Sequence, residues 1–256
     1  MPSPAIQFAR HATALKEAVD DVLSKPKAEP VHVLRSTLRR ITAELRLLAE
    51  SPKTTKRVAR FIHLSRPIIK TAGRVRDLDV HLDLLQDLPR PLKPEADKLE
   101  RHLQKRRRRG FTRLRNLLED DRSALLKSLA KLQSIAPTTP SPGRALANET
   151  LLRAVATFDP HRADQLHELR KAARDARYLA ESALRSTEKN SPAAHEAAHY
   201  RQIQQDVGAW HDYLTLASSA RKYLSSSSPL PPAIDRLRNR HHRSALKTIK
   251  SAAPRN

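Results

Sequence analysis

Two segments of this sequence repeat one another, and the repeat constrains the fold more than any other feature. VHVLRSTLRR at 31–40 has a counterpart in LHELRKAARDAR at 166–177. In both segments an apolar residue precedes a histidine, and arginines follow the histidine by three and seven positions. His32 therefore aligns with His167, at an offset of 135 residues. Self-similarity at a fixed offset is typical of a duplicated structural unit.

A second pair of segments follows the same offset without a gap. GRVRDLDV at 73–80 aligns with GAWHDYLT at 208–215, which places two of the chain's four glycines in register. The aligned residues are Arg66 with Arg201, Gly73 with Gly208, Arg76 with His211, and Asp77 with Asp212. We infer one domain over 1–256, with a first repeat at about 5–135, a linker at about 136–143 and a second repeat at about 144–250.

The pattern of apolar residues predicts an all-α fold. Apolar residues recur with a period near 3.6, the chain has only four glycines, and alternating strand-like segments are missing. The Pro-rich APTTPSPG at 136–143 and SSSSPLPP at 225–232 predict breaks. We expect helices at about 3–24, 30–50, 53–72, 78–88, 93–120, 121–135, 144–157, 161–187, 192–206, 212–225 and 231–250.

The helix expected at 30–50 separates its charges from its apolar residues. At about 100° per residue, the cations fall within roughly a 60° arc, and the apolar residues occupy a separate arc suited to a bundle core. The cationic arc holds His32, Arg35, Arg39 and Arg46. The apolar arc holds Leu34, Leu38, Ile41, Leu45 and Leu48. Aligned cations repel one another, so this face is a poor stabilising device and favours an anionic ligand.

Net charge narrows the choice of partner. The 49 Lys and Arg residues exceed the 27 Asp and Glu residues, which gives a formal charge of +22. A polyanion or an acidic membrane surface would neutralise this excess. Aromatic residues make up only 4% of the chain, too few for a protein that stacks unpaired bases. The absence of cysteine and of any long apolar run predicts a cytoplasmic protein without membrane insertion.

The aligned glycines and aspartates have two interpretations each. We expect Gly73 and Gly208 to end helices as C-caps with positive φ. Asp77 and Asp212 would then be N-caps of the following helices. Alternatively, each aspartate lies beside the arginines and orients a guanidinium group. We assign both aspartates a supporting role, in which each either orients a guanidinium group or caps a helix.

A third basic segment, LERHLQKRRRRGFTRLR, lies at 99–115. Its cations recur at helical spacing, but four consecutive arginines must point in all directions around a helix. We assign Lys105, Arg108 and Arg109 to the anion-binding surface, and for Arg106 and Arg107 a nonspecific, solvated basic patch remains an equal alternative.

HVLRSTLRR followed by GRVRDLDV, and HELRKAARDARYLAE followed by GAWHDYL, together resemble the CHAD domain, the conserved histidine α-helical domain. The resemblance covers about 5–250 and implies two pseudo-symmetric four-helix bundles, a central basic groove or pore, and binding of long-chain inorganic polyphosphate. The matching positions are His32, Arg35, Arg39, Arg40, Arg76, Asp77, His167, Arg170, Arg174, Arg177, Tyr178, His211 and Asp212.

The sequence departs from the family pattern in three respects. At positions 171 and 211 the family usually has a basic residue followed by Asp, and this chain has Lys171 and His211 there. A basic group is therefore kept, but the forked geometry of arginine is lost at position 211. The ExExK pattern of a triphosphate-cleaving partner domain is missing, and hydrolysis is therefore not expected.

We predict a noncatalytic polyphosphate-binding protein without a cofactor, with recruitment to polyphosphate granules as a further expectation. The predicted binding residues are His32, Arg35, Arg39, Arg40, Arg46, Arg66, Lys70, Arg76, Lys105, Arg108, Arg109, His167, Arg170, Lys171, Arg174, Arg177, Arg201 and His211.

Four alternatives remain. The chief one is nonspecific nucleic-acid binding, with nucleic acid as a competitor of polyphosphate. An enzyme acting on phosphoanhydrides would need carboxylate-held Mg²⁺ or a GxxxxGK[ST] loop, and the loop motif is absent. A histidine metal site is disfavoured because the surrounding arginines would repel a cation. Membrane-surface binding would need exposed Trp or Phe beside a basic face.

Overall fold

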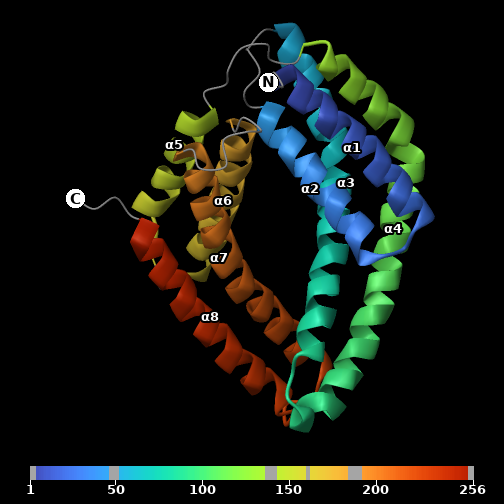
Figure 1. Cartoon of the computed structure of the whole chain (residues 1–256). Helices are drawn as coiled ribbons and strands as arrows, with labels where there is room; N and C mark the ends of the chain where they lie inside the picture. Colours follow the sequence, from blue (N-terminus) through green and yellow to red (C-terminus); the bar gives the residue numbers. More distant parts are fainter. Residues whose placement is uncertain (1–3, 46–51, 136–142, 160–161, 184–191, 253–256) are drawn as a thin grey trace. The chain divides into compact units, whose positions relative to one another are not determined.

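The computed structural model describes residues 4–45, 52–135, 143–159, 162–183 and 192–252, and these ranges contain α-helices and no strand (Figure 1). The prediction of an all-α fold is therefore confirmed. The helices are α1 (Pro4–Ser24), α2 (Ala28–Glu44), α3 (Pro52–Gln86), α4 (Lys93–Gln133), α5 (Gly143–Ala156), α6 (Ala163–Ala183), α7 (Pro192–Tyr223) and α8 (Leu230–Ala252), with a 3-10 turn at Arg90–Leu92.

Three predicted helix breaks are wrong. α3 continues through Gly73, α7 continues through Gly208, and α4 continues across 120–121. A single glycine inside a helix costs only about 1 kcal/mol relative to alanine, so packing on neighbouring helices can outweigh its intrinsic preference. Pro67 also lies inside α3.

The chain divides into two compact units, which do not follow the limits of the sequence repeats. The first unit contains residues 1–76, 107–144 and 178–194, and the second contains 77–106, 145–177 and 195–256. Helices α3, α4 and α6 therefore each contribute residues to both units.

The first unit is built on a core drawn from α1, α2, α3 and α4. α2 directs its predicted apolar arc into this core, where Leu34, Leu38 and Ile41 are fully buried and Leu45 is 4% exposed. Phe61 from α3 and Leu114 and Leu118 from α4 complete the same cluster. Packing of this arc fixes the rotation of α2 about its axis, and the polar side of the helix must then face away from the core. Leu48 lies outside the described residues.

The second unit has a core of its own. One cluster joins Leu85 of α3, Leu99 and Leu103 of α4, Leu216 of α7 and Ile234 of α8. Leu166, Leu169 and Ala173 of α6 are also buried. The apolar side of α6 is thus covered, and its basic side is positioned in the same way as that of α2.

Candidate anion-binding site

The first unit gathers basic side chains from α2 and α3. His32, Arg35 and Arg40 come from α2, and Arg76 comes from α3; we call these four residues the first basic cluster. Loss of hydration, and next the positive charge of Arg76, hold the pKa of His32 below its usual value. Arg35 and Arg40 act in the same direction, while Glu29 opposes them. His32 therefore lies in a positive electrostatic environment, and it is exposed to solvent.

The second unit contains a similar group on α6 and α7. His167, Arg170 and Lys171 come from α6, and His211 comes from α7; we call these the second basic cluster. The rings of His167 and His211 lie 5.2 Å apart between centroids. Burial, and then His211, lower the pKa of His167, with further contributions from Lys171 and Arg170 against Glu168. The second basic cluster, like the first, therefore places positive charge around a histidine, and His167 is partly exposed.

In each cluster an arginine side chain lies against a glycine of the neighbouring helix. The Nε atom of Arg35 is 3.5 Å from the position a Cβ atom would take at Gly73. The Nε atom of Arg170 is 3.6 Å from the equivalent position at Gly208, and its Nη2 atom is 4.0 Å away. An alanine would just make ordinary contact, whereas a longer side chain would displace the guanidinium group. The offset of 135 residues thus relates two contacts as well as two sequences.

This contact corrects the expected role of the glycines. Neither Gly73 nor Gly208 ends a helix, and no glycine among the described residues has positive φ. The C-cap prediction is therefore wrong, and so is the N-cap prediction for Asp77 and Asp212, because both aspartates lie inside helices. The glycines instead leave room for arginine side chains that arrive from α2 and α6.

Asp212 lies beside the second basic cluster. Its Oδ1 atom is 3.7 Å from Nη2 of Arg170 and 3.6 Å from Nδ1 of His211. The side chains of Arg170 and Asp212 are 21% and 25% exposed, so solvent screens this pair only in part. This geometry agrees with the alternative reading of Asp212 as an acid that orients a guanidinium group. Asp77, the aligned residue on α3, is exposed.

Several predicted arginines and lysines also contact acids or rings. The guanidinium of Arg40 lies 5.5 Å from the ring centre of Tyr178, and its Nε is 3.6 Å from Oε2 of Glu181. Arg174 donates from Nε and Nη2 to Oδ1 of Asp175, at 3.2 and 3.0 Å. Lys171 donates to Glu168 at 2.7 Å. These contacts hold the cations in fixed directions but partly neutralise them.

The remaining predicted residues lie elsewhere on the helices. Arg39 and Arg177 are half-buried. The exposed residues are Arg66, Lys70, Lys105, Arg108, Arg109 and Arg201. Arg106 is exposed, but Arg107 is half-buried and donates to the carbonyl oxygen of Pro26 at 3.1 Å. Arg46 lies outside the described residues.

His81 of α3 is a residue that sequence reasoning missed. It is 5% exposed, and its Nε2 lies 2.9 Å from Oγ1 of Thr215 on α7. The same Oγ1 atom lies 3.0 Å from the carbonyl oxygen of His211 and 3.1 Å from that of Asp212. Burial lowers the pKa of His81, while Asp212 and Asp77 oppose the shift. The pairing of positions 81 and 215 crosses the two repeats, so alignment by offset could not reveal it.

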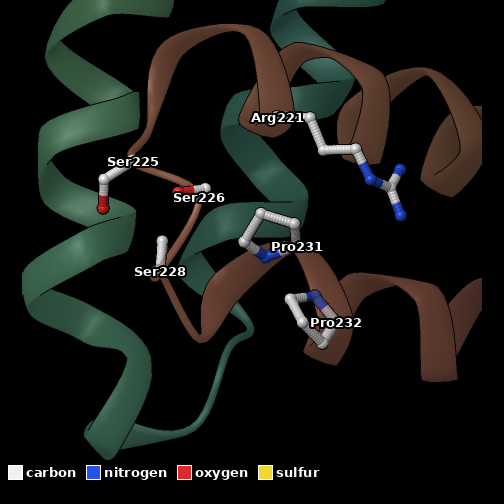
Figure 2. Close-up of a pocket in the computed structure, with 6 residues that line it drawn as sticks. All are labelled: Arg221, Ser225, Ser226, Ser228, Pro231 and Pro232. Atoms are coloured by element: carbon white, nitrogen blue, oxygen red, sulfur yellow. The ribbon is translucent and has the colours of Figure 1, made fainter.

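A pocket of about 360 Å³ lies at the turn from α7 to α8 (Figure 2). It is lined by Arg221, Ser225, Ser226, Ser228, Pro231 and Pro232. Arg221 pairs with Asp235 of α8, and its guanidinium points away from the three serines in Figure 2. The pocket contains none of the predicted binding residues.

Within the described part of the chain, no group of three or more His, Asp or Glu side chains is arranged to hold a metal ion. None of the described helices is both long enough and apolar enough to cross a membrane.

Comparison with known proteins agrees with the all-helical architecture. A family model described as the CHAD domain matches residues 6–221, which is most of the chain. This chain belongs to the CHAD domain family. The match begins in α1 and ends in α7, so it includes both basic clusters of the CHAD chain. No curated protein matches the sequence.

Two solved structures share the fold of this CHAD chain. The crystal structure of the CHAD domain from the plant Ricinus communis has a TM-score of 0.66 at 15% identity, covering 96% of this chain and 90% of that one. PptA from Streptomyces chartreusis has a TM-score of 0.68 at 18% identity, covering 97% and 96%. At these identities the likeness establishes the fold alone.

Proposed function

We propose that this CHAD domain binds long-chain inorganic polyphosphate without cleaving it. The ligand contacts would come from the two basic clusters, through arginine, lysine and histidine side chains. A flexible chain of phosphates carries a charge at each unit and offers no bases, so it suits guanidinium and ammonium donors at short intervals. Family membership supports this ligand class, and the charge of +22 supplies the attraction.

The observation that carries the proposal is the repeated contact of arginine with glycine. In both units a guanidinium group lies against a glycine of the next helix, two turns or less from a histidine with a lowered pKa. A solvated surface arginine gains little from being held in one direction, because water solvates its guanidinium group equally well in many conformations. A ligand-binding arginine benefits, since less conformational entropy is lost when the anion binds.

Phosphate recognition is favoured over recognition of single-stranded nucleic acid. Proteins that bind unpaired strands use exposed aromatic rings as stacking platforms. Among the large aromatic side chains of the described residues, Tyr223 is the exposed one. Its ring already stacks on the ring of His102, with 3.9 Å between the ring centroids. Trp210, next to His211, is only 4% exposed. The clusters therefore offer hydrogen-bond donors without stacking surfaces.

The chemistry of the same groups supports the proposal that the chain binds polyphosphate without cleaving it. Phosphoryl transfer generally uses Mg²⁺ that is held by carboxylates. Asp212, a carboxylate beside the second basic cluster, faces Arg170 and His211. Release of phosphate during prolonged incubation of the chain with polyphosphate and Mg²⁺ or Mn²⁺ would contradict this part of the proposal.

The decisive experiment combines chain length with substitution. We expect the affinity for a chain of about 100 phosphates to exceed that for tripolyphosphate by at least 100-fold at 150 mM salt, because more phosphates release counterions. The quadruple variant Arg35→Ala, Arg76→Ala, Arg170→Ala, Lys171→Ala removes two cations from each cluster and should lose at least 10-fold in affinity for the long chain.

A matched control removes four cations from exposed positions outside the two clusters. The variant Arg10→Ala, Lys16→Ala, Lys53→Ala, Lys127→Ala has the same net charge as the test variant, and we expect it to lose less than 3-fold in affinity. Equal losses in the two variants would show that binding depends on net charge alone. Displacement of polyphosphate by duplex DNA at equal charge concentration would favour general polyanion binding. Recruitment to polyphosphate granules in cells is the corresponding proposal for localisation.

A further inference from the structure

Helix α8 carries a row of cations that belongs to neither basic cluster. The row is Arg236, Arg240, Arg243, Lys247 and Lys250, all of which are exposed; we call it the α8 row. Its members follow one another at intervals of four, three, four and three residues. This spacing places them within an arc of about 80° and along about 21 Å of the helix.

Packing fixes the direction of the α8 row. Ile234 and Leu230 are fully buried in the core of the second unit, and Ala245 and Ile249 are buried further along the same helix. Leu230 and Ile234 pack with residues of α4 and α7, and Ala245 and Ile249 continue the same buried side of α8, so the row remains on the solvent side.

Acidic side chains do not neutralise the α8 row. Asp235 is the one acid in the sequence of α8, and it pairs with Arg238 at 3.0 Å and with Arg221. Within the part of the chain that the structure describes, none of the five cations of the row forms an ion pair. Cations spaced by three and four residues repel one another, so the row opposes helix stability unless an anion lies along it.

The offset of 135 residues relates the α8 row to the basic segment of α4. Arg101, Lys105, Arg108 and Arg115 of α4 align with Arg236, Arg240, Arg243 and Lys250, and these α4 residues are exposed too. The second repeat has the stronger row. It places Lys247 opposite Thr112, and it has Pro254 opposite Glu119, the acid that pairs with Arg115 at 3.1 Å.

The aromatic residues next to α8 are not open to stacking by a ligand. His241 stacks on the ring of Tyr213 at 4.9 Å, with an angle of 14° between the rings. His242 lies 6.0 Å from the ring of the buried Trp210. The exposed face of α8 therefore offers charge without stacking platforms, and it also lacks the exposed apolar side chains that an interfacial membrane helix needs.

We propose that the α8 row is a second contact surface for a long polyphosphate chain, outside the two basic clusters. This inference rests on the proposed function. A narrow, straight row of cations fits a linear polyanion that lies along the helix. A chain of about 100 phosphates has phosphates to spare for the row after it has filled a cluster, whereas tripolyphosphate does not. Once a cluster holds one part of the polyphosphate, the row contacts another part of the same molecule, so long chains gain affinity that short chains do not.

The test replaces four cations of the row with a residue that also favours helix. The variant Arg236→Gln, Arg240→Gln, Arg243→Gln, Lys247→Gln should bind a chain of about 100 phosphates at least 10-fold more weakly at 150 mM salt. The slope of log affinity against log salt should fall by about 3, since each lost phosphate contact contributes about 0.7. Affinity for tripolyphosphate should stay within 2-fold.

A control variant changes the same number of charges elsewhere: Lys16→Gln, Lys53→Gln, Lys56→Gln, Lys127→Gln, all exposed in the first unit. It should retain long-chain affinity within 3-fold. Circular dichroism and thermal unfolding check that both variants fold.

The outcomes separate this inference from the proposed function. If the unmodified chain binds no polyphosphate of any length, both fail. If it binds long chains and the α8 variant matches the control, only the α8 row is refuted. An equal loss for tripolyphosphate would place the row within the primary site and overturn the second surface. Vesicles of phosphatidylserine and phosphatidylcholine form a further arm: binding to them that is lost in the α8 variant, with long-chain affinity unchanged, would identify a membrane surface instead.

Discussion

Arg170 of α6 reaches Asp212 of α7 across Gly208, so that one guanidinium group contacts a glycine and a carboxylate one turn apart on the same helix. The glycine removes a side chain that would obstruct the arginine, and the aspartate supplies an acceptor at 3.7 Å. Arg35 lies against Gly73 in the same way in the other unit. This arrangement makes the direction of two arginines depend on residues of the neighbouring helix.

The size of the side chain at position 208 should control anion binding. For Gly208→Leu we expect about a 10-fold loss of affinity for long-chain polyphosphate, because atoms beyond Cβ displace Arg170. Gly208→Ala is the matched control. Its Cβ would lie 3.6 Å from Nε of Arg170, so affinity should hold, and the free energy of unfolding should rise by up to about 1 kcal/mol through helix propensity. Binding titrations and urea unfolding measure the two effects. Equal affinities for the two variants would contradict the proposal that Gly208 leaves room for Arg170.

The carboxylate of Asp212 should assist binding although its charge repels the ligand. Asp212→Asn raises the net charge by one, so a simple electrostatic role predicts tighter binding. We expect the opposite, a loss of about 3-fold in affinity for polyphosphate, because Arg170 loses its ionic partner and becomes less ordered. Isothermal titration at 150 mM salt decides between these signs. Asp164→Asn, at an exposed position of α6, is the control with the same charge change.

Polyphosphate affinity should increase as the pH falls from 7.5 to 5.5. Burial and neighbouring cations hold the pKa of His32 and of His167 below 6.5 in the free protein. A bound polyanion stabilises the protonated form and raises both pKa values, so binding takes up protons. The increase in polyphosphate affinity starts as the pH drops through the histidine pKa of the bound protein. It is complete below the histidine pKa of the free protein. We expect about a 3- to 10-fold increase in total.

The double variant His32→Gln, His167→Gln should show a flatter pH profile over the same range. His195→Gln, at an exposed position of α7, should leave the profile unchanged. A profile of the double variant that matches that of the unmodified chain would assign the pH dependence to other groups.

Local patterns in the sequence predict the all-helical fold and the apolar side of α2 correctly, although not every helix boundary. Leu34, Leu38 and Ile41 are buried as expected, because a period of 3.6 residues reports directly on which side of a helix meets the core. The pairing of His32 with Arg35 and of His167 with Arg170 also follows from spacing on one helix.

Contacts between helices account for the errors. A glycine is typical both of a helix end and of a close approach by another chain segment, and only the partner helix distinguishes the two. At positions 73 and 208 the approaching group is an arginine from a helix about 38 residues earlier, which lies far beyond the range of local patterns. The contact of His81 with Thr215 was missed for the same reason.

The continuity of α7 through Gly208 has a consequence for how this protein can change over evolutionary time. Gly208, His211, Asp212 and Thr215 lie within eight consecutive residues of one unbroken helix. Removing or adding a single residue among them would turn the following residues by about 100° and carry the carboxylate away from Arg170. Substitutions can therefore accumulate around these positions, whereas insertions and deletions must be confined to the connections between helices.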